Sequence, residues 1–392
     1  MASSMSCAAV IIYAESRFVG WWLCVHFEDT GQLKEANCIM YERTEDLRIE
    51  ELRPLLPPAI LVYEELPITK EAMHTVTDAR RQVADIIAGR DDRLIVVTGP
   101  CSIHDTTAAL DYAQQLKPHM ERLSSQLCIV MRVYFEKPRT TIGWKGLIND
   151  PNLDGRFQIN QGLRTARRLL LDLANMGMPA GTEFLDTITP QFTADLVTWG
   201  AIGARTTESQ VHRELASGLS MPVGFKNGTG GTIQIAIDGV GAARHPHRFL
   251  SVTKEGLAAI VSTRGNESCH VILRGSNAGP NYDAETVAQT AQKLRTSDLP
   301  DRVLIDTSHG NSQKDYRRQP EVAHSVAAQV AAGSYDICGV MMESHLVEGR
   351  QDHDTGEPLT YGQSITDACI SMETTIPLLD ELADAVTKRR GQ

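Results

Sequence analysis

The chain has 392 residues, of which 42% are hydrophobic and 22% are charged, as in globular proteins and unlike disordered or fibrous ones. Lys and Arg number 38 against 49 Asp and Glu, which gives a net charge of −11. An acidic surface repels phosphate backbones and anionic lipids, so nucleic-acid and membrane partners are disfavoured. The eight cysteines form no CxxC pair, which favours reduced thiols and a cytoplasmic location over a secreted disulfide framework.

The first 39 residues differ in composition from the rest of the chain. They contain two of the four tryptophans and three of the eight cysteines. The apolar stretch 8–27 is interrupted by Glu15 and Arg17, so it falls short of the roughly 20 apolar residues that a membrane span needs. Met40 begins a polar segment that leads into an apolar-periodic stretch. We therefore predict that residues 1–39 are an extension of doubtful origin and that Met40 is the true start; a real extension is the alternative.

We interpret residues 40–92 as an N-terminal arm that contacts another subunit. Within it, Pro57 and Pro58 precede the apolar run 59–63. This run predicts a strand that could pair with a second copy of the chain. The expected assembly is a homodimer or a homotetramer.

From residue 93 to the C-terminus, short apolar runs alternate with stretches of helical periodicity. This alternation predicts parallel βαβ units, and eight units predict an α/β fold, a (β/α)₈ TIM barrel over 93–392. An open doubly wound sheet is the lesser alternative. The predicted helices include 107–117, 159–176 and 321–332. The predicted strands are 94–98, 128–135, 181–184, 200–205, 223–226, 270–274, 303–306 and 339–343.

Residues of about 229–268 contain a further pair of strand-like runs, at 249–252 and 258–263. The eight repeats are complete without this pair. We therefore interpret the segment as an inserted β-strand pair that decorates the barrel.

Each predicted barrel strand ends at or near an ionisable side chain. Catalytic groups of TIM barrels lie at the C-terminal ends of the strands, so we expect these side chains at one rim. Arg binds phosphate and carboxylate in bidentate fashion, and Lys acts as a compact point charge. The cations therefore predict one or two substrates that carry at least two phosphate or carboxylate groups. These cations are Arg132, Lys137, Arg139, Arg205, Lys226 and Arg274.

A second set combines a thiol, an imidazole and two carboxylates. It consists of Cys101, His309, Glu343 and Asp367. Such a mixed set suits one divalent transition metal ion, such as Mn, Fe, Co or Zn. The four residues are distant in sequence, and Cys101 alone would more often be a small buried hydrophobe. The barrel favours the metal, because its first, seventh and eighth strands are neighbours when it closes.

Six segments, in this order, carry a resemblance to a known family. They are GPCSIH at 99–104, KPRT at 137–140, GWKGLINDP at 143–151, GARTTESQ at 203–210, GFKNGT at 224–229 and SITDAC at 364–369. With these segments the chain resembles type I 3-deoxy-D-arabino-heptulosonate 7-phosphate (DAHP) synthase, the first enzyme of the shikimate pathway to aromatic amino acids. The resemblance covers about residue 40 to the C-terminus.

The resemblance implies that phosphoenolpyruvate condenses with D-erythrose 4-phosphate and that phosphate is released. It implies that Lys137 gives a proton to the new alkoxide and that Glu183 or His309 orients water or a proton near the enol carbon. Arg139 and Thr140 would hold the sugar phosphate, and Asp367 would serve both the metal and the substrates. The implied metal ligands are Cys101, His309, Glu343 and Asp367. Phosphoenolpyruvate would be held by Arg132, Lys137, Arg205, Lys226 and Arg274.

The resemblance also implies feedback inhibition by an aromatic amino acid, at a site built partly from the inserted strand pair. Ser251 stands where phenylalanine-sensitive members tend to carry serine and tyrosine-sensitive members glycine, which favours phenylalanine. Ser220 and Gln191 match positions in the same pocket, and Asp46 lies in the arm. The alternative for Ser251 is a small strand residue with no effector role.

Two other functions stay open. A 3-deoxy-D-manno-octulosonate 8-phosphate synthase uses the same chemistry on arabinose 5-phosphate, but the KPRT segment and the long insert disfavour it. A catalytically silent barrel that binds an aromatic amino acid and regulates a partner is disfavoured by the complete sets of cations and metal ligands.

Overall fold

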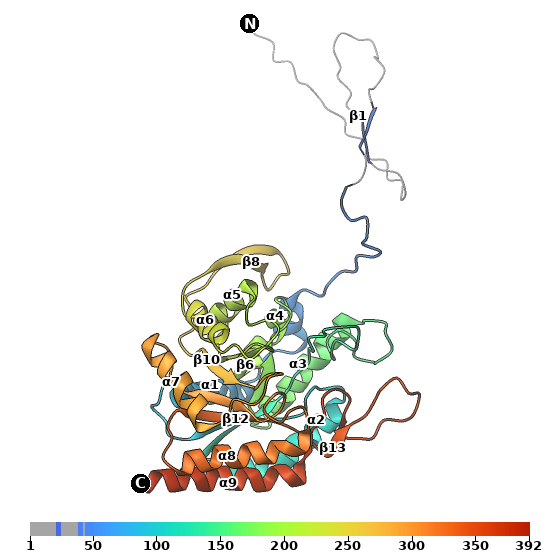
Figure 1. The fold of residues 1–392 in the computed structure, drawn as a ribbon. Coiled ribbons are helices and arrows are strands. Elements are labelled where there is room, and N and C mark those ends of the chain that lie inside the picture. The colour runs from blue at the N-terminus through green and yellow to red at the C-terminus, as the bar shows by residue number, and fades with distance from the viewer. Residues whose placement is uncertain (1–20, 25–37, 42–43) are drawn as a thin grey trace, which may run out of the picture. The chain divides into compact units, whose positions relative to one another are not determined.

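The computed structural model describes residues 21–24, 38–41 and 44–392 (Figure 1). It divides the chain into two units, Met1–Pro54 and Leu55–Gln392. In the first unit, β1 (Trp21–Cys24) pairs antiparallel with β2 (Cys38–Tyr41). The start predicted at Met40 falls inside β2 and stays a prediction. The boundary between the units falls inside segment 40–92, which we expect to be one arm.

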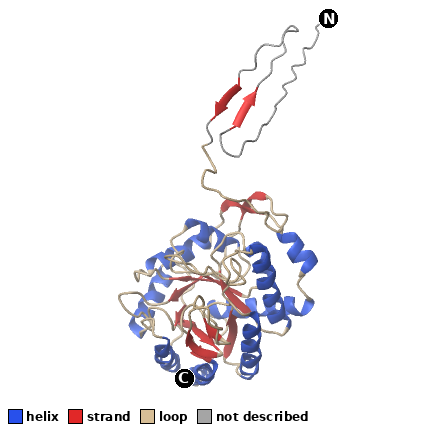
Figure 2. Cartoon of the chain, turned by 90° about the vertical axis from the view of Figure 1, so that its right-hand side faces the viewer, coloured by secondary structure: helices blue, strands red, loops and turns tan. Residues whose placement is uncertain are grey.

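In the part of the chain that the structure describes, eight parallel strands close into the predicted barrel. Their order is β11-β10-β7-β6-β5-β4-β3-β12, and β11 pairs with β12 to complete the ring. Figure 2 shows the strands inside a ring of helices. The strands are β3 (Leu94–Gly99), β4 (Leu127–Arg132), β5 (Ala180–Glu183), β6 (Trp199–Ile202), β7 (Val223–Lys226), β10 (His270–Leu273), β11 (Val303–Asp306) and β12 (Ile337–His345).

Helices connect consecutive barrel strands and cover the barrel from outside. Several begin at a side chain that caps the first turn, as Asp105 does for the backbone N–H of Thr107 and Ser371 for that of Thr374, which stabilises the helix start. The short β13 (Val347–Arg350), β14 (Gln363–Ser364) and β15 (Ile370–Ser371) follow β12. The helices are α1 (Lys70–Ile87), α2 (Thr106–Arg122), α3 (Ile159–Asn175), α4 (Pro190–Thr193), α5 (Gln210–Gly218), α6 (Gln234–Ala243), α7 (Ala284–Thr296), α8 (Gln319–Ala331) and α9 (Met372–Arg390), with 3₁₀ turns at Ala194–Leu196 and Tyr316–Arg318.

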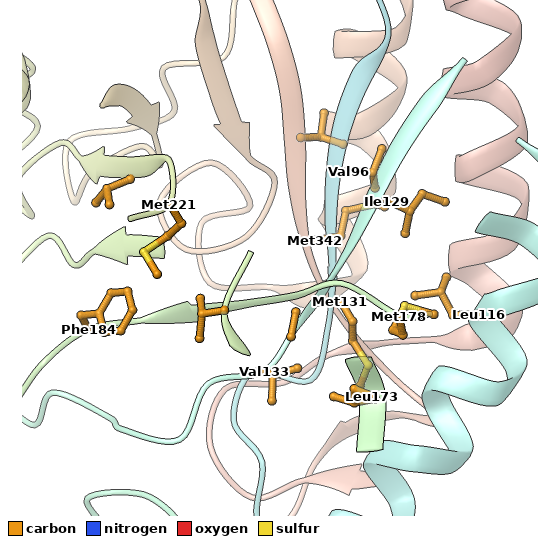
Figure 3. Packing of buried hydrophobic residues seen from close by; sticks show 14 of the residues in the cluster. Val96, Leu116, Ile129, Met131, Val133, Leu173, Met178, Phe184, Met221 and Met342 are labelled. Carbon is orange, nitrogen blue, oxygen red and sulfur yellow. The ribbon is translucent and has the colours of Figure 1, made fainter. Parts of the chain in front are cut away.

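The barrel strands carry nearly continuous runs of buried aliphatic side chains. Val96, Ile129 and Met131 pack in one cluster with helix residues such as Leu116 and Leu173 (Figure 3). Parallel strands that are covered on both faces are expected to be apolar throughout. The charged residues at the strand ends are therefore exceptions to the local pattern.

A second cluster combines side chains of the strands with side chains of α1. Val83, Ile86 and Ile87 of α1 join residues such as Val97 and Leu304. Alternate strand residues of a TIM barrel point inward. The apolar face of α1 therefore closes the N-terminal end of the barrel.

The inserted strand pair is present, with β8 (Arg248–Val252) antiparallel to β9 (Ala258–Ser262). The predicted arm strand is wrong, because residues Ile60–Glu65 form a π-helix. Leu61 and Val62 are buried there, and a short apolar run suits a buried helix as well as a strand. Among the described residues, no helix combines the length and apolar character that a membrane crossing requires.

Candidate functional site

The C-terminal ends of the barrel strands surround a cavity of about 350 Å³, at the end where TIM-barrel enzymes carry their active sites. Cys101 and Glu343 lie behind the cavity wall and are fully buried. Thr140 accepts a hydrogen bond from Nε of Arg205 at 3.0 Å. The other predicted substrate, catalytic and metal residues line the cavity: Arg132, Lys137, Arg139, Glu183, Arg205, Lys226, Arg274, His309 and Asp367.

Three of the four predicted metal ligands form a group. One ligand atom each from Cys101, Glu343 and Asp367 lies within 4.8 Å of the others, and Sγ of Cys101 is 3.3 Å from Oδ2 of Asp367. His309 lies beside this group, with Nε2 3.9 Å from Oε1 of Glu343. The barrel thus brings Cys101 next to residues that follow it by more than 200 positions in sequence.

The charges around Cys101 test whether this group suits a metal. Burial raises the pKa of the Cys101 thiol to about 12, the charge of Glu343 adds to this, and Lys137 opposes it. Such a thiol is neutral at pH 7 unless a bound cation stabilises the thiolate. Nζ of Lys137 lies 3.0 Å from Sγ of Cys101 and 3.6 Å from Oδ2 of Asp367. A thiol and two carboxylates in this arrangement fit a divalent transition metal ion.

Several cations of the cavity are paired with carboxylates of the protein. Nη2 of Arg132 donates to Oε1 of Glu343 at 2.8 Å. Nζ of Lys226 lies 3.4 Å from Oδ2 of Asp306 and 3.6 Å from Oε2 of Glu183. These pairs correct the sequence argument: the protein itself neutralises part of the cationic set, so the number of cations alone does not give the charge of the substrates.

The remaining predicted cations have no ion-pair partner in the described part of the chain. Arg274 is 8% exposed, Arg139 donates to the backbone oxygen of Trp144, and Arg205 contacts Thr140. All three arginines line the cavity. They supply its excess positive charge, which suits phosphate or carboxylate ligands.

Sequence analysis missed some residues of this region. Lys314 and Arg350 add cations to the cavity lining, but Lys314 lies in a loop and Arg350 ends the four-residue strand β13, neither of which a periodicity marks. His309, Gln313 and Lys314 have φ between 54° and 65°, a left-handed conformation that is uncommon in non-glycine residues and clusters at functional sites. Asp306 is fully buried at the end of β11; its place at a strand end is the signal that could have identified it.

The predicted regulatory residues are only partly brought together. Nε2 of Gln191 donates to the backbone oxygen of Val252 at 2.9 Å, so α4 contacts the β8–β9 hairpin. Ser251 lies half-buried in β8, and Ser220 is exposed just after α5. Asp46 belongs to the first unit, whose placement relative to the hairpin is not described.

Comparisons with known proteins agree on one family. The family model "DAHP synthetase I family" matches residues 65–380. A "Phospho-2-dehydro-3-deoxyheptonate aldolase, Phe-sensitive" of Escherichia coli K12 is 60% identical over 352 residues, which are 90% of this chain and 100% of the relative. A "tyrosine-inhibited" relative of Schizosaccharomyces pombe is 56% identical over 353 residues, 89% of this chain and 95% of the relative.

A solved structure leads to the same result. The phospho-2-dehydro-3-deoxyheptonate aldolase of Francisella tularensis SCHU S4 superposes with a TM-score of 0.86 and 55% identity, over 88% of this chain and 100% of that chain. These relatives support the DAHP synthase reading and not the two alternatives. The fold, the strand-end residues and the relatives agree: the chain belongs to the DAHP synthetase I family.

Proposed function

We propose that the cavity at the C-terminal ends of the strands holds both substrates of the DAHP synthase reaction, phosphoenolpyruvate and D-erythrose 4-phosphate. The observation that carries this proposal is the convergence of unpaired arginines on the group formed by Cys101, Glu343 and Asp367. A site for two phosphorylated anions and a metal needs both features.

The two substrates bind at two neighbouring anion sites. Arg139 and Thr140 hold the sugar phosphate. The contact between Arg205 and Thr140 supports placing the two sites side by side. Holding two anions against their mutual repulsion in one geometry supplies much of the acceleration. Phosphoenolpyruvate is held by Arg132, Lys137, Arg205, Lys226 and Arg274.

One divalent metal ion, Mn, Fe, Co or Zn, is held by Cys101, His309, Glu343 and Asp367. When bound, it orients or polarises the aldehyde of erythrose 4-phosphate. Asp367 also lines the cavity and therefore contacts the substrates as well. The thiol among the ligands favours a transition metal over Mg²⁺ or Ca²⁺.

C3 of phosphoenolpyruvate attacks the aldehyde carbon, and the electron pair of the enol double bond forms the new C–C bond. Lys137 gives a proton to the resulting alkoxide. Burial lowers the pKa of Lys137, but Cys101 when it is a thiolate, together with the carboxylates of Asp367 and Glu343, outweighs burial and raises this pKa above its usual range. Lys137 is therefore protonated and ready to donate.

Water oriented by Glu183 or His309 then adds to C2 of the former enol. The phosphohemiketal that forms breaks its C–O bond and releases inorganic phosphate. Glu183 lies 3.6 Å from Lys226, which supports a position next to the phosphoenolpyruvate site.

Phosphate release with each aldose tests the activity. We expect release with erythrose 4-phosphate and none with arabinose 5-phosphate, loss of release in excess chelator, and recovery with Mn²⁺. Release with arabinose 5-phosphate alone would support the octulosonate enzyme. Cys101→Ala is expected to lose both bound metal and turnover; full activity without bound metal would contradict the ligand set.

Feedback inhibition uses the β8–β9 hairpin, with Ser251, Ser220, Gln191 and Asp46 at the effector site and phenylalanine favoured over tyrosine. The relatives include both phenylalanine-sensitive and tyrosine-inhibited proteins, so the preference for phenylalanine as the effector depends on Ser251 alone. The protein is cytoplasmic, without nucleic-acid or membrane partners, and assembles as a homodimer or homotetramer. Inhibition assays with phenylalanine, tyrosine and tryptophan identify the effector, and light scattering identifies the assembly.

A further inference from the structure

Asp306 is a buried carboxylate at the C-terminal end of β11 to which the mechanism above gives no role. Its side chain is fully buried. Oδ1 accepts a hydrogen bond from the backbone N–H of Ser308 at 3.0 Å, which fixes one oxygen and leaves Oδ2 for other partners. A buried carboxylate is costly unless donors or cations surround it.

Oδ2 of Asp306 faces two residues of the proposed site. It lies 2.9 Å from Nδ1 of His309 and 3.4 Å from Nζ of Lys226. Although these two atoms lie 2.9 Å apart, neither meets the geometry of a hydrogen bond with any described residue, so two buried polar atoms that lack a partner face one another. The positive charge of Lys226 beside this oxygen offsets part of the cost of burying the carboxylate.

The conformation of His309 adds a second observation. Its φ of 56° is unusual for a residue with a side chain, and such conformations persist where the surroundings hold them. Its backbone oxygen accepts a hydrogen bond from the N–H of Lys314 at 2.7 Å, and Nδ1 of its ring lies 2.9 Å from Oδ2 of Asp306. Nε2 is left facing Glu343 at 3.9 Å, a member of the group that suits a metal.

We propose that Asp306 is a positioning residue that fixes the tautomer and the direction of the His309 ring. A carboxylate that accepts the proton of Nδ1 leaves the lone pair of Nε2 free for a metal ion. The inference rests on the proposed function, because it assumes that His309 binds the metal through Nε2.

A double-mutant cycle on metal binding tests the inference. Asp306→Asn, His309→Gln and the double variant are freed of metal and titrated with Co²⁺. In Asp306→Asn one oxygen becomes an NH₂ group, so the amide cannot accept hydrogen bonds from both Ser308 and His309. We expect Asp306→Asn to bind Co²⁺ about 10- to 100-fold more weakly than the wild type.

The double variant separates positioning from a general charge effect. If Asp306 acts through His309, the double variant binds Co²⁺ within about twofold of His309→Gln. Additive losses would overturn the proposal, because they would show that the lost negative charge weakens cation binding without His309. Asp301→Asn is the matched control: Asp301 precedes the same strand and pairs with Arg295 at the surface, so this variant should bind Co²⁺ as the wild type does.

A measurement on the wild type keeps the inference testable if Asp306→Asn fails to fold. In the metal-free protein, ¹⁵N NMR of labelled histidines identifies His309 by its absence from His309→Gln. We expect the neutral ring to carry its proton on Nδ1, and a proton on Nε2 would overturn the proposal. If the wild type binds no metal, the proposed function fails; if it binds metal and Asp306→Asn binds equally well, only this inference fails.

Discussion

The cavity rim and the β8–β9 hairpin are built on the same barrel, yet they place their side chains in opposite ways. In the rim, several charges are buried in pairs, as in Arg132 and Glu343 with exposures of 1% and 0%. In the hairpin, large apolar side chains face outward, with Leu250 83% and Ile260 75% exposed. A buried charge depends on its partner, whereas a single exposed apolar side chain is tolerated. Single substitutions should therefore have large effects in the rim and small ones in the hairpin.

The two regions also differ in how firmly they are held. Arg132 donates to Glu343 and to the backbone oxygens of Pro100 and Cys101, so its guanidinium has one direction. The hairpin contacts α4 through hydrogen bonds that involve Gln191. A rim that is fixed before substrates bind suits charge stabilisation, which depends on preorganised groups.

The largest effect should follow loss of the proposed proton donor in the rim. We expect Lys137→Ala to lower kcat by about 10²- to 10⁴-fold without a matching rise in KM. Steady-state phosphate release measures both constants. Lys117→Ala, which removes a half-exposed lysine of α2 that pairs with Glu121, should leave kcat unchanged; an active Lys137→Ala would contradict the proposed role.

A buried ion pair of the rim should dominate stability. Removing one partner of such a pair costs about 3–5 kcal/mol, because the other charge stays buried alone. We expect this loss in the free energy of unfolding of Arg132→Met, measured with denaturant in chelator. The double variant with Glu343→Leu should recover most of it. A loss below about 1 kcal/mol would mean that the rim pair stabilises the protein no more than a surface ion pair does. Substitutions in the rim would then cost no more stability than those in the hairpin.

Glu136 lies between the two regions and should give a pH-dependent effect. It follows β4, and its Oε2 accepts a hydrogen bond from Thr189 at 2.9 Å, next to α4. Burial, and after it the charge of Asp186, raises the pKa of Glu136 to about 8. A raised pKa in the folded protein means that this contribution to stability is fully present below the unfolded pKa and is lost as the pH rises from there through about 8, by at most about 5 kcal/mol.

Glu136→Gln should remove this loss. Denaturant unfolding near pH 5 and near pH 9 should show a smaller decrease for the variant than for the wild type. An equal decrease in both proteins would mean that other groups cause the pH dependence.

A smaller change is expected from the hairpin residue Ser251. We expect Ser251→Gly to shift the preference for phenylalanine over tyrosine by about tenfold, which corresponds to about 1.4 kcal/mol of binding. The ratio of the two half-inhibitory concentrations measures this shift. An unchanged ratio would mean that Ser251 is only a small strand residue.

The smallest effect should come from the outward face of the hairpin. Leu250→Gln is expected to change the free energy of unfolding by less than about 0.5 kcal/mol. A larger loss, accompanied by a smaller assembly in light scattering, would mean that another subunit covers this face. The hairpin would then resemble the rim in depending on a partner.

Much of the fold follows from the apolar runs, because eight of them alternate with helices. The runs 223–226 and 303–306 match β7 and β11. The run 128–135 extends beyond β4, which ends at Arg132, because Val133, Tyr134 and Phe135 are buried after the strand has ended. Hydrophobicity reports burial, and burial continues into the loops near a cavity.

The residues that make up the site could be predicted from the sequence, but the ion pairs that they form with one another could not. Strand ends of a TIM barrel meet at one rim, so residues such as Arg274 could be assigned to the cavity from their positions. The partners could not, because the pairing of Lys226 with Asp306 depends on side-chain directions in the closed barrel. Lys314 and Arg350 could not be found either, because a loop and the short strand β13 carry no hydrophobic period that would predict them.

The apolar end of α1 has a consequence for how molecules reach the site. Val83, Ile86 and Ile87 pack among the inward strand residues and close the N-terminal end of the barrel. Ligands therefore enter and leave through the opening at the C-terminal ends of the strands. A molecule resting on the buried Arg132 and Lys226 sits deeper than one resting on the exposed Arg139 and Thr140. If the substrates bind as proposed, we expect an order of binding, in which the deeper ligand enters before the shallower one and leaves after it.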